Sequence, residues 1–129
     1  MAFQLDQIVA WGRSFDEYVR MFSLTNDNLR RRILGCGDSP ASFNAATHQM
    51  GNRVVSIDPL YQFSAEEIRG RIRAVCLTIL EQLVANQSAY VWTTVLSTED
   101  LGRIRMKAME EFLADYEFQR GSNEMLRIW

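Results

Sequence analysis

Residues 33–58 read ILGCGDSPASFNAATHQMGNRVVSID, and this stretch decides the fold. At its start, Arg31–Leu34 ends in a β-branched and apolar pair and stops at Gly35, which predicts a first, buried strand. At its other end, Arg53–Ile57 has the same β-branched and apolar character and predicts a second strand. We therefore expect two short strands, and the residues between them determine how they pair.

A helix is predicted between these strands. Pro40 suits the first turn of a helix over Ala41–Met50, because the backbone N–H that proline lacks would have no partner there, and Gly51 is well placed to end the helix. One helix and two tight turns have the length at which a parallel crossover is the natural connection. The stretch is therefore predicted to be a βαβ unit of the nucleotide-binding type.

A glycine turn and a carboxylate mark the carboxyl ends of the two strands. Gly35 and Gly37 follow the first strand, where glycine permits both a sharp turn and the close approach of a ligand to main-chain N–H groups. Asp58 closes the second strand, 21 residues after Gly37, so its carboxylate is expected beside the turn, where it can accept hydrogen bonds from both hydroxyls of a ribose. A dinucleotide fingerprint needs a third glycine where Pro40 stands, so NAD and FAD are disfavoured.

These residues resemble two motifs of a known family. Ile33–Asp38, ILGCGD, is similar to the first motif of class I S-adenosylmethionine-dependent methyltransferases, and Ser56–Tyr61, SIDPLY, is similar to the second. The longer runs GCGDSPASFN (35–44) and DPLYQFS (58–64) resemble a bacterial, mostly uncharacterised subgroup. The resemblance extends over roughly Tyr18 to Ile72. It implies a Rossmann-like fold, S-adenosyl-L-methionine as the cofactor, and methyl transfer to an unknown acceptor.

The resemblance also implies roles for the residues of the two motifs. The turn from Gly35 to Ser39 is expected to hold the methionine moiety, Asp58 the ribose hydroxyls, and the three residues after Asp58 the border of the adenine. The implied cofactor-binding set is Gly35, Cys36, Gly37, Asp38, Ser39, Asp58, Pro59, Leu60 and Tyr61. Catalytic residues are not implied, because the acceptor-facing part of the family's fold follows its fourth strand, and no metal ligands are predicted.

Two departures from the family pattern bear on cofactor affinity. Ser39 stands where a third glycine is common, and Ile33 stands where an acidic residue often precedes the first glycine. Asp38 is a candidate to take over the role of that acid towards the methionine ammonium. The alternative for the whole turn is an ordinary strand-to-helix connection in which glycine only permits close packing. The carboxylate of Asp58 favours the cofactor site over this alternative.

Other candidate residues have simpler explanations. Cys36 is expected to be a small buried hydrophobe, because no base that would activate a nucleophile is identifiable. His48, the single histidine, is expected to face solvent from a helix. Tyr18, Met21 and Phe22 form a group that either closes over a ligand like a lid or, more commonly, packs on the sheet as the apolar face of a helix.

Helices are predicted on both sides of the βαβ unit. Ser14 with Glu17 and Ser64 with Glu67 are capping boxes, and Ser97 caps a last helix. The expected buried stripes are, in turn, Phe15, Tyr18, Val19 and Phe22; Ile68, Ile72, Val75, Ile79, Leu83 and Val84; and Leu101, Ile104, Ala108, Met109, Phe112, Leu113 and Tyr116.

We expect one α/β domain with an incomplete sheet. Residues 1–30 are predicted to form a helical N-terminal segment, and residues 31–129 the cofactor-binding unit with several flanking helices. Residues 90–95 are either a short strand or an apolar loop, and residues 125–129 are predicted to begin another strand, which gives a Rossmann-like parallel sheet of two to three strands. The resembled family has seven strands with the first one central. The prediction is therefore the truncated, N-terminal half of a methyltransferase fold, with an exposed sheet edge that invites association with a second chain.

Composition excludes several classes of protein. The formal net charge of −2 argues against a general nucleic-acid binder, because such proteins usually present a basic face. Cys36 and Cys76 share no CxxC spacing, which indicates a reduced, cytoplasmic setting without disulfides or zinc. No apolar run approaches the ~20 residues that a membrane-spanning helix needs, so no membrane partner is expected.

Three functions remain open at this stage. The first is an S-adenosylmethionine-dependent methyltransferase, or a truncated form of one. The second is a binding module that keeps a nucleotide-like pocket without turnover. The third is a mainly helical interaction protein that packs on a partner through the stripes around Ile68–Val84 and Leu101–Tyr116.

Overall fold

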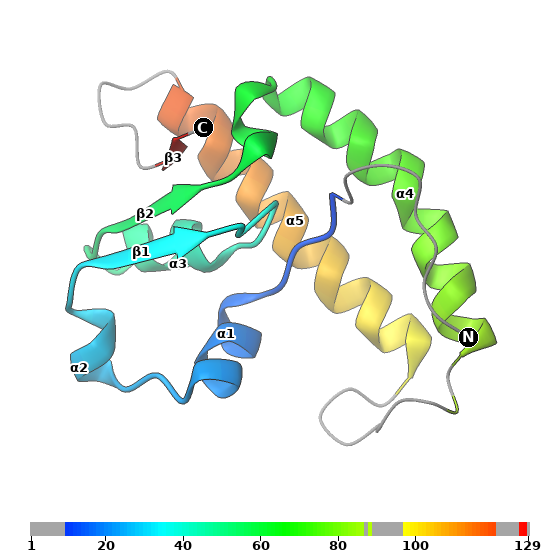
Figure 1. The fold of residues 1–129 in the computed structure, drawn as a ribbon, viewed down its shortest axis with the longest axis horizontal. Helices are drawn as coiled ribbons and strands as arrows, with labels where there is room; N and C mark the ends of the chain where they lie inside the picture. The colour runs from blue at the N-terminus through cyan, green and yellow to red at the C-terminus, as the bar shows by residue number, and fades with distance from the viewer. Residues whose placement is uncertain (1–9, 87, 89–96, 121–126, 129) are drawn as a thin grey trace.

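A small parallel sheet backed by helices organises the chain (Figure 1). The computed structural model describes residues 10–86, 88, 97–120, 127 and 128. The described elements, in chain order, are α1 (Phe15–Phe22), α2 (Asn26–Leu29), β1 (Ile33–Cys36), α3 (Phe43–Gln49), β2 (Val54–Ile57), the 3-10 helix η1 (Pro59–Gln62), α4 (Ala65–Ala85), α5 (Thr98–Arg120) and β3 (Arg127–Ile128). The protein is therefore of mixed α/β class, as predicted.

The sheet has the strand order β1-β2-β3, and both pairings are parallel. Ile33 lies beside Val54 and Gly35 beside Ser56, while Ser56 also lies beside Arg127 on the other side. Because α3 connects β1 to β2, the predicted βαβ unit is confirmed. β3 confirms the prediction of a further strand, and residues 125, 126 and 129 lie outside the described residues.

The predicted first strand, Arg31–Leu34, is displaced by two residues. β1 begins at Ile33, because the N–H of Arg31 still donates to the carbonyl oxygen of Asn28, at 3.1 Å, and so belongs to the end of α2. β1 also continues past Gly35, because this glycine and the residue after it both pair with β2 in the parallel ladder. The prediction that the strand stops at this glycine is therefore wrong.

The predicted helix over Ala41–Met50 is shorter in the structure. α3 begins only at Phe43, and Pro40 lies in a turn before the helix, where the N–H of Ala41 donates to the carbonyl oxygen of Asp38 at 3.3 Å. Gly51 follows α3 with a φ of +82°, a left-handed conformation that glycine adopts without strain. Its predicted role as the helix terminator is confirmed.

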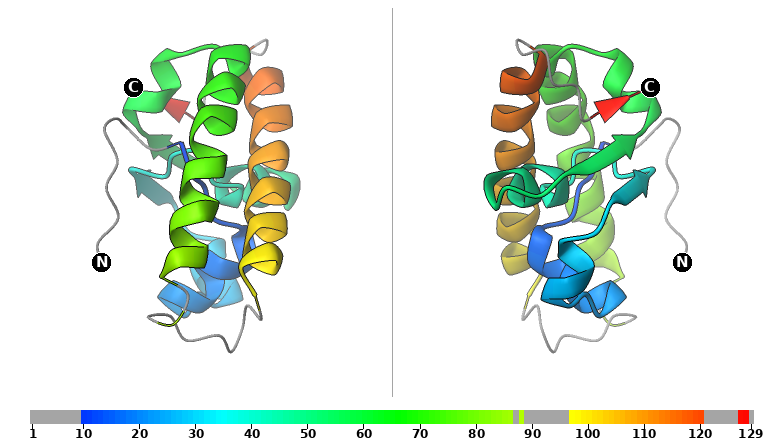
Figure 2. Two further views of the ribbon diagram at one scale, coloured as in Figure 1. Left: turned by 90° about the vertical axis from the view of Figure 1, so that its right-hand side faces the viewer. Right: turned by 90° about the vertical axis from the view of Figure 1, so that its left-hand side faces the viewer.

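The sheet is covered on one face only by the described helices. α3 and α5 lie on that face (Figure 2), and the side chains of Val54 and Ser56 beneath them are buried. On the opposite face, Leu34 is 58% exposed and Ile57 37% exposed. Because side chains alternate along a strand, this one-sided burial follows directly from which face the helices occupy.

The largest core cluster lies between α4, α5 and η1, with α4 and α5 packed side by side (Figure 2). The predicted stripes of these two helices are confirmed, except that Leu101 and Ile104 are only partly buried and Val84, in the last turn of α4, is 53% exposed. The stripe of α1 is only partly buried, and its last residue, Phe22, is 60% exposed. The buried members of the cluster are Ala10, Leu60, Tyr61, Ile68, Ile72, Met109, Phe112, Leu113 and Tyr116.

Capping side chains fix where the helices begin. Ser14 with Glu17, and Ser64 with Glu67, form complete capping boxes at α1 and α4, as predicted. The hydroxyl of Ser97 accepts a hydrogen bond from the N–H of Asp100 at 3.0 Å, which confirms Ser97 as the cap of α5. Such caps satisfy backbone N–H groups that the first helical turn leaves without partners.

Two predictions fall on residues that the structure does not describe. The segment 90–95, which the sequence left open between strand and loop, lies outside the described residues, and so does Gly121, the predicted end of the last helix. Among the described helices, none combines the length and the apolar character that a membrane crossing requires.

Two phenylalanines of α5 test the position of the core. Phe112 is 0% exposed and Phe118 is 68% exposed. We expect Phe112→Ala to lower the free energy of unfolding by about 3–5 kcal/mol, because a large cavity forms, and Phe118→Ala to change it by less than about 0.5 kcal/mol. Urea unfolding followed by circular dichroism measures both, and equal losses would show that α5 does not present this face to the core.

Candidate functional site

The turn after β1 and the residue after β2 meet at the carboxyl edge of the sheet. The N–H of Gly37 donates to the carbonyl oxygen of Ile57 at 2.8 Å, and the N–H of Ser39 donates to Oδ2 of Asp58 at 2.8 Å. The sequence predicted that the glycine turn and the carboxylate would converge, and the structure brings them into direct contact.

Asp58 already holds two backbone groups in place. Its Oδ1 accepts a hydrogen bond from the N–H of Leu60 at 2.8 Å and so caps η1, while Oδ2 holds Ser39. The residue is only 6% exposed. Each carboxylate oxygen has a second lone pair, so further hydrogen bonds from ligand hydroxyls remain chemically possible.

The carboxylate of Asp38 folds back over Gly35. Its Oδ1 accepts a hydrogen bond from the hydroxyl of Tyr18 at 3.1 Å, and its Oδ2 accepts one from the hydroxyl of Ser56 at 2.7 Å. A Cβ atom on Gly35 would lie 1.9 Å from Oδ2 of Asp38. Glycine is therefore required at position 35 to leave room for the protein's own carboxylate, a reason that the sequence pattern did not reveal.

Two residues of the turn have left-handed backbone conformations. Gly37 has a φ of +71° and Ser39 a φ of +53°. The position at which the resembled family commonly has a third glycine thus keeps the conformation that glycine favours, although serine occupies it at a cost of about 1–2 kcal/mol. The hydrogen bond from Ser39 to Asp58 helps to hold this conformation.

The residues after Asp58 divide between the core and the surface. Leu60 and Tyr61 are buried in the core cluster, and the hydroxyl of Tyr61 donates to the carbonyl oxygen of Ser39 at 2.9 Å. Burial raises the pKa of the Tyr61 hydroxyl far above its usual range. The structure thus gives the side chains of Leu60 and Tyr61 a packing role, whereas Pro59 is partly exposed.

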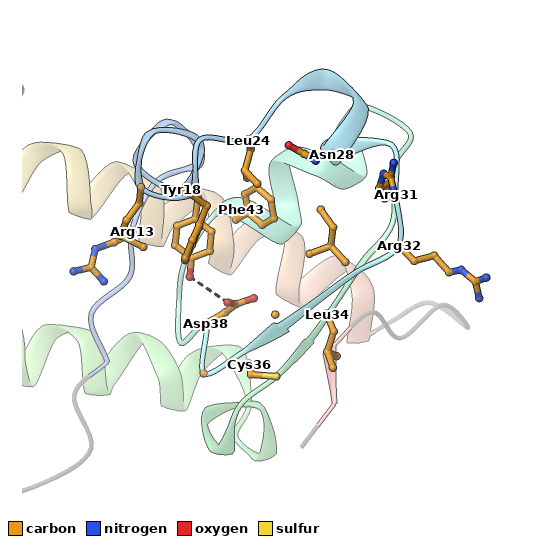
Figure 3. Close-up of a pocket in the computed structure, with 15 residues that line it drawn as sticks. Arg13, Tyr18, Leu24, Asn28, Arg31, Arg32, Leu34, Cys36, Asp38 and Phe43 are labelled. Atoms are coloured by element: carbon orange, nitrogen blue, oxygen red, sulfur yellow. Dashed lines mark hydrogen bonds between the residues drawn. The ribbon is translucent and has the colours of Figure 1, made fainter.

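A cavity of about 680 Å³ lies between β1 and the helices α1 and α2 (Figure 3). Gly35, Cys36, Gly37 and Asp38 of the predicted cofactor set line it, whereas Ser39 and Asp58–Tyr61 are not among its lining residues. The predicted set therefore surrounds two neighbouring places: the cavity beside β1 and the buried edge at the end of β2.

The group Tyr18, Met21 and Phe22 divides between packing and the cavity, and its predicted role as a lid stays a prediction. Tyr18 packs on Phe43, with ring centroids 5.0 Å apart, as the apolar face of a helix would. Met21 and Phe22, which are 50% and 60% exposed, line the cavity. Burial, with the neighbouring carboxylate of Asp38, raises the pKa of the Tyr18 hydroxyl far above its usual range.

The prediction for Cys36 is wrong. Its side chain is exposed rather than buried, because it points to the face of the sheet that no described helix covers. Exposure places its thiol on the wall of the cavity.

His48 is not simply solvent-facing. Its Nδ1 lies 3.4 Å from Oδ1 of Asp115, and Oδ2 of Asp115 accepts hydrogen bonds from Gln119 at 2.6 Å and from Arg127 at 2.9 Å. The guanidinium of Arg127 is buried over the ring of Phe112, at 4.7 Å from its centroid. Sequence reasoning missed this cluster, since its members come from α3, α5 and β3 and share no local motif.

Comparison with known proteins does not assign this chain to a family. The chain is 29% identical over 118 residues to an uncharacterised protein of the archaeon Methanocaldococcus jannaschii, a match that covers 90% of this chain. The chain spans about half, 53%, of the length of that relative. No protein-family model and no solved structure matches the chain.

The two glycines of the turn give a matched pair of substitutions. We expect Gly35→Ala to displace the Asp38 carboxylate and to break its hydrogen bonds to Tyr18 and Ser56, with a loss of unfolding free energy of more than about 2 kcal/mol. A Cβ on Gly37 meets open space, so Gly37→Ala should cost only the left-handed backbone strain of about 1–2 kcal/mol. The urea concentration at the midpoint of unfolding measures the loss of stability in each variant. A larger loss for Gly37→Ala would contradict the role given to Gly35.

The raised pKa values of Tyr18 and Tyr61 predict alkaline sensitivity. Below about pH 10 both hydroxyls are neutral in the folded and unfolded chains, so their contribution to stability is complete. Above about pH 10 the two tyrosine hydroxyls ionise in the unfolded chain before they ionise in the folded chain. The free energy of unfolding should therefore fall as the pH rises. Urea unfolding at about pH 9 and pH 11 should show a smaller fall for Tyr18→Phe than for the unmodified protein. An identical fall in both would refute burial of this hydroxyl.

Proposed function

We propose that this protein binds S-adenosylmethionine at the carboxyl ends of β1 and β2, as part of a Rossmann-like methyltransferase fold. The strand order β1-β2-β3 with parallel pairing and the α3 crossover support this assignment. In open α/β sheets, ligands bind at the carboxyl ends of the strands, which is where the glycine turn and Asp58 lie.

One observation carries the proposal: the hydrogen bond between the N–H of Ser39 and Oδ2 of Asp58, 2.8 Å long. It joins the turn after one strand to the acid after the neighbouring strand. A ribose held by Asp58 is then adjacent to a group held by the turn, as one nucleoside ligand requires. Ser39 and Asp58, which are 19 residues apart in sequence, thus lie together at one edge of the sheet.

Each part of the cofactor has a chemical partner in this arrangement. The carboxylate oxygens of Asp58 accept hydrogen bonds from the ribose hydroxyls through their second lone pairs. Pro59, which is partly exposed, borders the adenine. The turn Gly35–Ser39 receives the methionine moiety, and the carboxylate of Asp38 attracts its ammonium while remaining bonded to Tyr18. The cofactor, when bound, supplies a methyl group on a sulfonium centre. What the chain contributes is therefore alignment of the donor.

The proposal is tested by titration calorimetry with S-adenosylmethionine and S-adenosylhomocysteine. We expect Asp58→Asn to weaken binding by about 1.5–3 kcal/mol, because the charge-assisted bonds to the ribose are lost. Asp16→Asn, which changes an exposed carboxylate on α1, is the matched control and should leave affinity unchanged.

Folding of the Asp58→Asn variant must be checked by circular dichroism, since Asp58 also caps η1. A folded variant with unchanged affinity would remove Asp58 from the site. Absence of both heat and thermal stabilisation at millimolar cofactor would remove the cofactor from the proposal, because a ligand at 100 times its Kd stabilises by about 2.7 kcal/mol.

The proposed setting is the cytoplasm. Cys36 and Cys76 are both free thiols, and Cys36 is exposed. Exposed free thiols persist where the cell keeps them reduced. The methyl acceptor would be a molecule of the same compartment.

A further inference from the structure

Ser56 places a hydroxyl group inside the covered face of the sheet. It lies on β2 beside Gly35, is 0% exposed, and is the single polar residue of a strand that otherwise consists of two valines and an isoleucine. A buried hydroxyl costs free energy unless it is hydrogen-bonded. Oγ of Ser56 lies 2.7 Å from Oδ2 of Asp38 and 2.9 Å from Nδ2 of Asn44. The polar group of this strand therefore connects the turn after β1 to α3.

The donor and acceptor roles around Ser56 are fixed by the neighbouring groups. Nδ2 of Asn44 carries two hydrogens and donates to the carbonyl oxygen of Val54 and to Oγ of Ser56, each at 2.9 Å. Because the carbonyl oxygen of Val54 can only accept, the nitrogen of the Asn44 amide must be the atom that faces β2. The hydrogen of the Ser56 hydroxyl is thus left for the carboxylate of Asp38, which accepts it.

α5 holds the orientation of Asn44 in turn. Oδ1 of Asn44 accepts a hydrogen bond from Nε2 of Gln119 at 3.3 Å, and the same nitrogen of Gln119 donates to Oδ2 of Asp115 at 2.6 Å. Both amide side chains are buried, with Asn44 2% and Gln119 4% exposed. An unbroken line of hydrogen bonds therefore runs from α5 through α3 and β2 to Asp38.

Two donors from different elements hold the carboxylate of Asp38. Ser56 on β2 donates to Oδ2, and the hydroxyl of Tyr18 on α1 donates to Oδ1 at 3.1 Å (Figure 3). One donor on each oxygen fixes the plane of the carboxylate, because the last torsion of an aspartate side chain is otherwise broad. Each oxygen keeps a second lone pair for a ligand, and Asp38 lines the cavity beside the turn. The carboxylate is thus presented in one orientation.

We infer that Ser56 is a positioning residue, which orients the carboxylate of Asp38 towards the ammonium group of the cofactor. Asn44 and Gln119 support it by fixing the direction of its hydroxyl. The inference rests on the proposed function, in which Asp38 attracts this ammonium. Ser56 is buried and acts only through Asp38, because an acceptor that is already held in place loses less freedom when the ligand binds.

The test compares two ligands that differ only in the group that Asp38 is expected to bind. S-adenosylhomocysteine carries the ammonium, and its deamino analogue has hydrogen in that place. Titration calorimetry gives the ratio of their dissociation constants, which measures the preference for the ammonium. We expect the unmodified protein to bind the deamino analogue about tenfold more weakly, because a charge-assisted hydrogen bond is lost with the ammonium.

Ser56→Ala should weaken the binding of S-adenosylhomocysteine about fivefold and that of the deamino analogue less than about twofold, so the ratio falls. A residue that only stabilises the fold would weaken both ligands equally and leave the ratio unchanged. Gln119→Met removes the far end of the line without a direct change to Asp38 or Ser56, and it should lower the ratio by a smaller factor. This second variant decides the question if Ser56→Ala does not fold by circular dichroism.

The matched control is Thr47→Val on α3. Thr47 is also 0% exposed, and its hydroxyl donates to the carbonyl oxygens of Phe43 and Asn44, which are main-chain groups of the same helix. Valine keeps the shape of threonine and removes the buried hydroxyl. The ratio of the two dissociation constants should therefore stay that of the unmodified protein.

Three outcomes contradict the inference, and they separate it from the proposed function. An equal loss for the two ligands in Ser56→Ala, or in Gln119→Met if the first variant does not fold, removes the positioning role alone. Equal affinities of the unmodified protein for the two ligands remove the ammonium from Asp38 and leave a nucleoside site. Absence of binding of both ligands overturns the inference together with the proposed cofactor site.

Discussion

The carboxylate of Asp58 is the constraint on which the described site depends. It is buried at the end of β2, and its two oxygens accept the N–H groups of Ser39 and Leu60, each at 2.8 Å. Hydrogen bonds to an ionised group are the stronger kind, and they compensate for burying the charge. Without these two hydrogen bonds, the N–H groups of Ser39 and Leu60 and the Asp58 carboxylate would all lack partners. The left-handed turn after β1 and the start of η1 are therefore fixed by one side chain.

This constraint also connects the candidate site to the core. η1 begins at Asp58 and places Leu60 and Tyr61 in the cluster between α4 and α5. The hydroxyl of Tyr61 donates a hydrogen bond to the carbonyl oxygen of Ser39. The hydroxyl of Tyr116 on α5 donates one to the carbonyl oxygen of Tyr61 at 3.0 Å. The turn is thus held from two directions by the packed core. A ligand at this edge meets a preorganised backbone, which lowers the entropy cost of binding.

The sheet has two different faces because the described helices gather on one of them. α3 and α5 bury Val54 and Ser56, whereas Leu34 and Ile57 lie on the opposite face and are exposed to solvent. The same asymmetry gives Cys36 its exposure, and the edge of β1 lies beside a cavity lined by both charged and apolar residues. The proposed cofactor site lies at the carboxyl ends of the strands of this sheet.

Local rules were enough to predict the helix starts at Ser14, Ser64 and Ser97, the parallel βαβ unit, and the meeting of the glycine turn with Asp58, since caps, side-chain period and crossover length act over a few residues. Tertiary packing alone decided which face of the sheet is covered, and with it the exposure of Cys36. It also decided that the Asp38 carboxylate fills the space over Gly35 and that η1 turns its apolar side chains into the core. The same holds for the cluster of His48, Asp115, Gln119 and Arg127, which joins residues up to 79 positions apart. Such contacts depend on how distant elements are placed, and no short stretch of sequence encodes that placement.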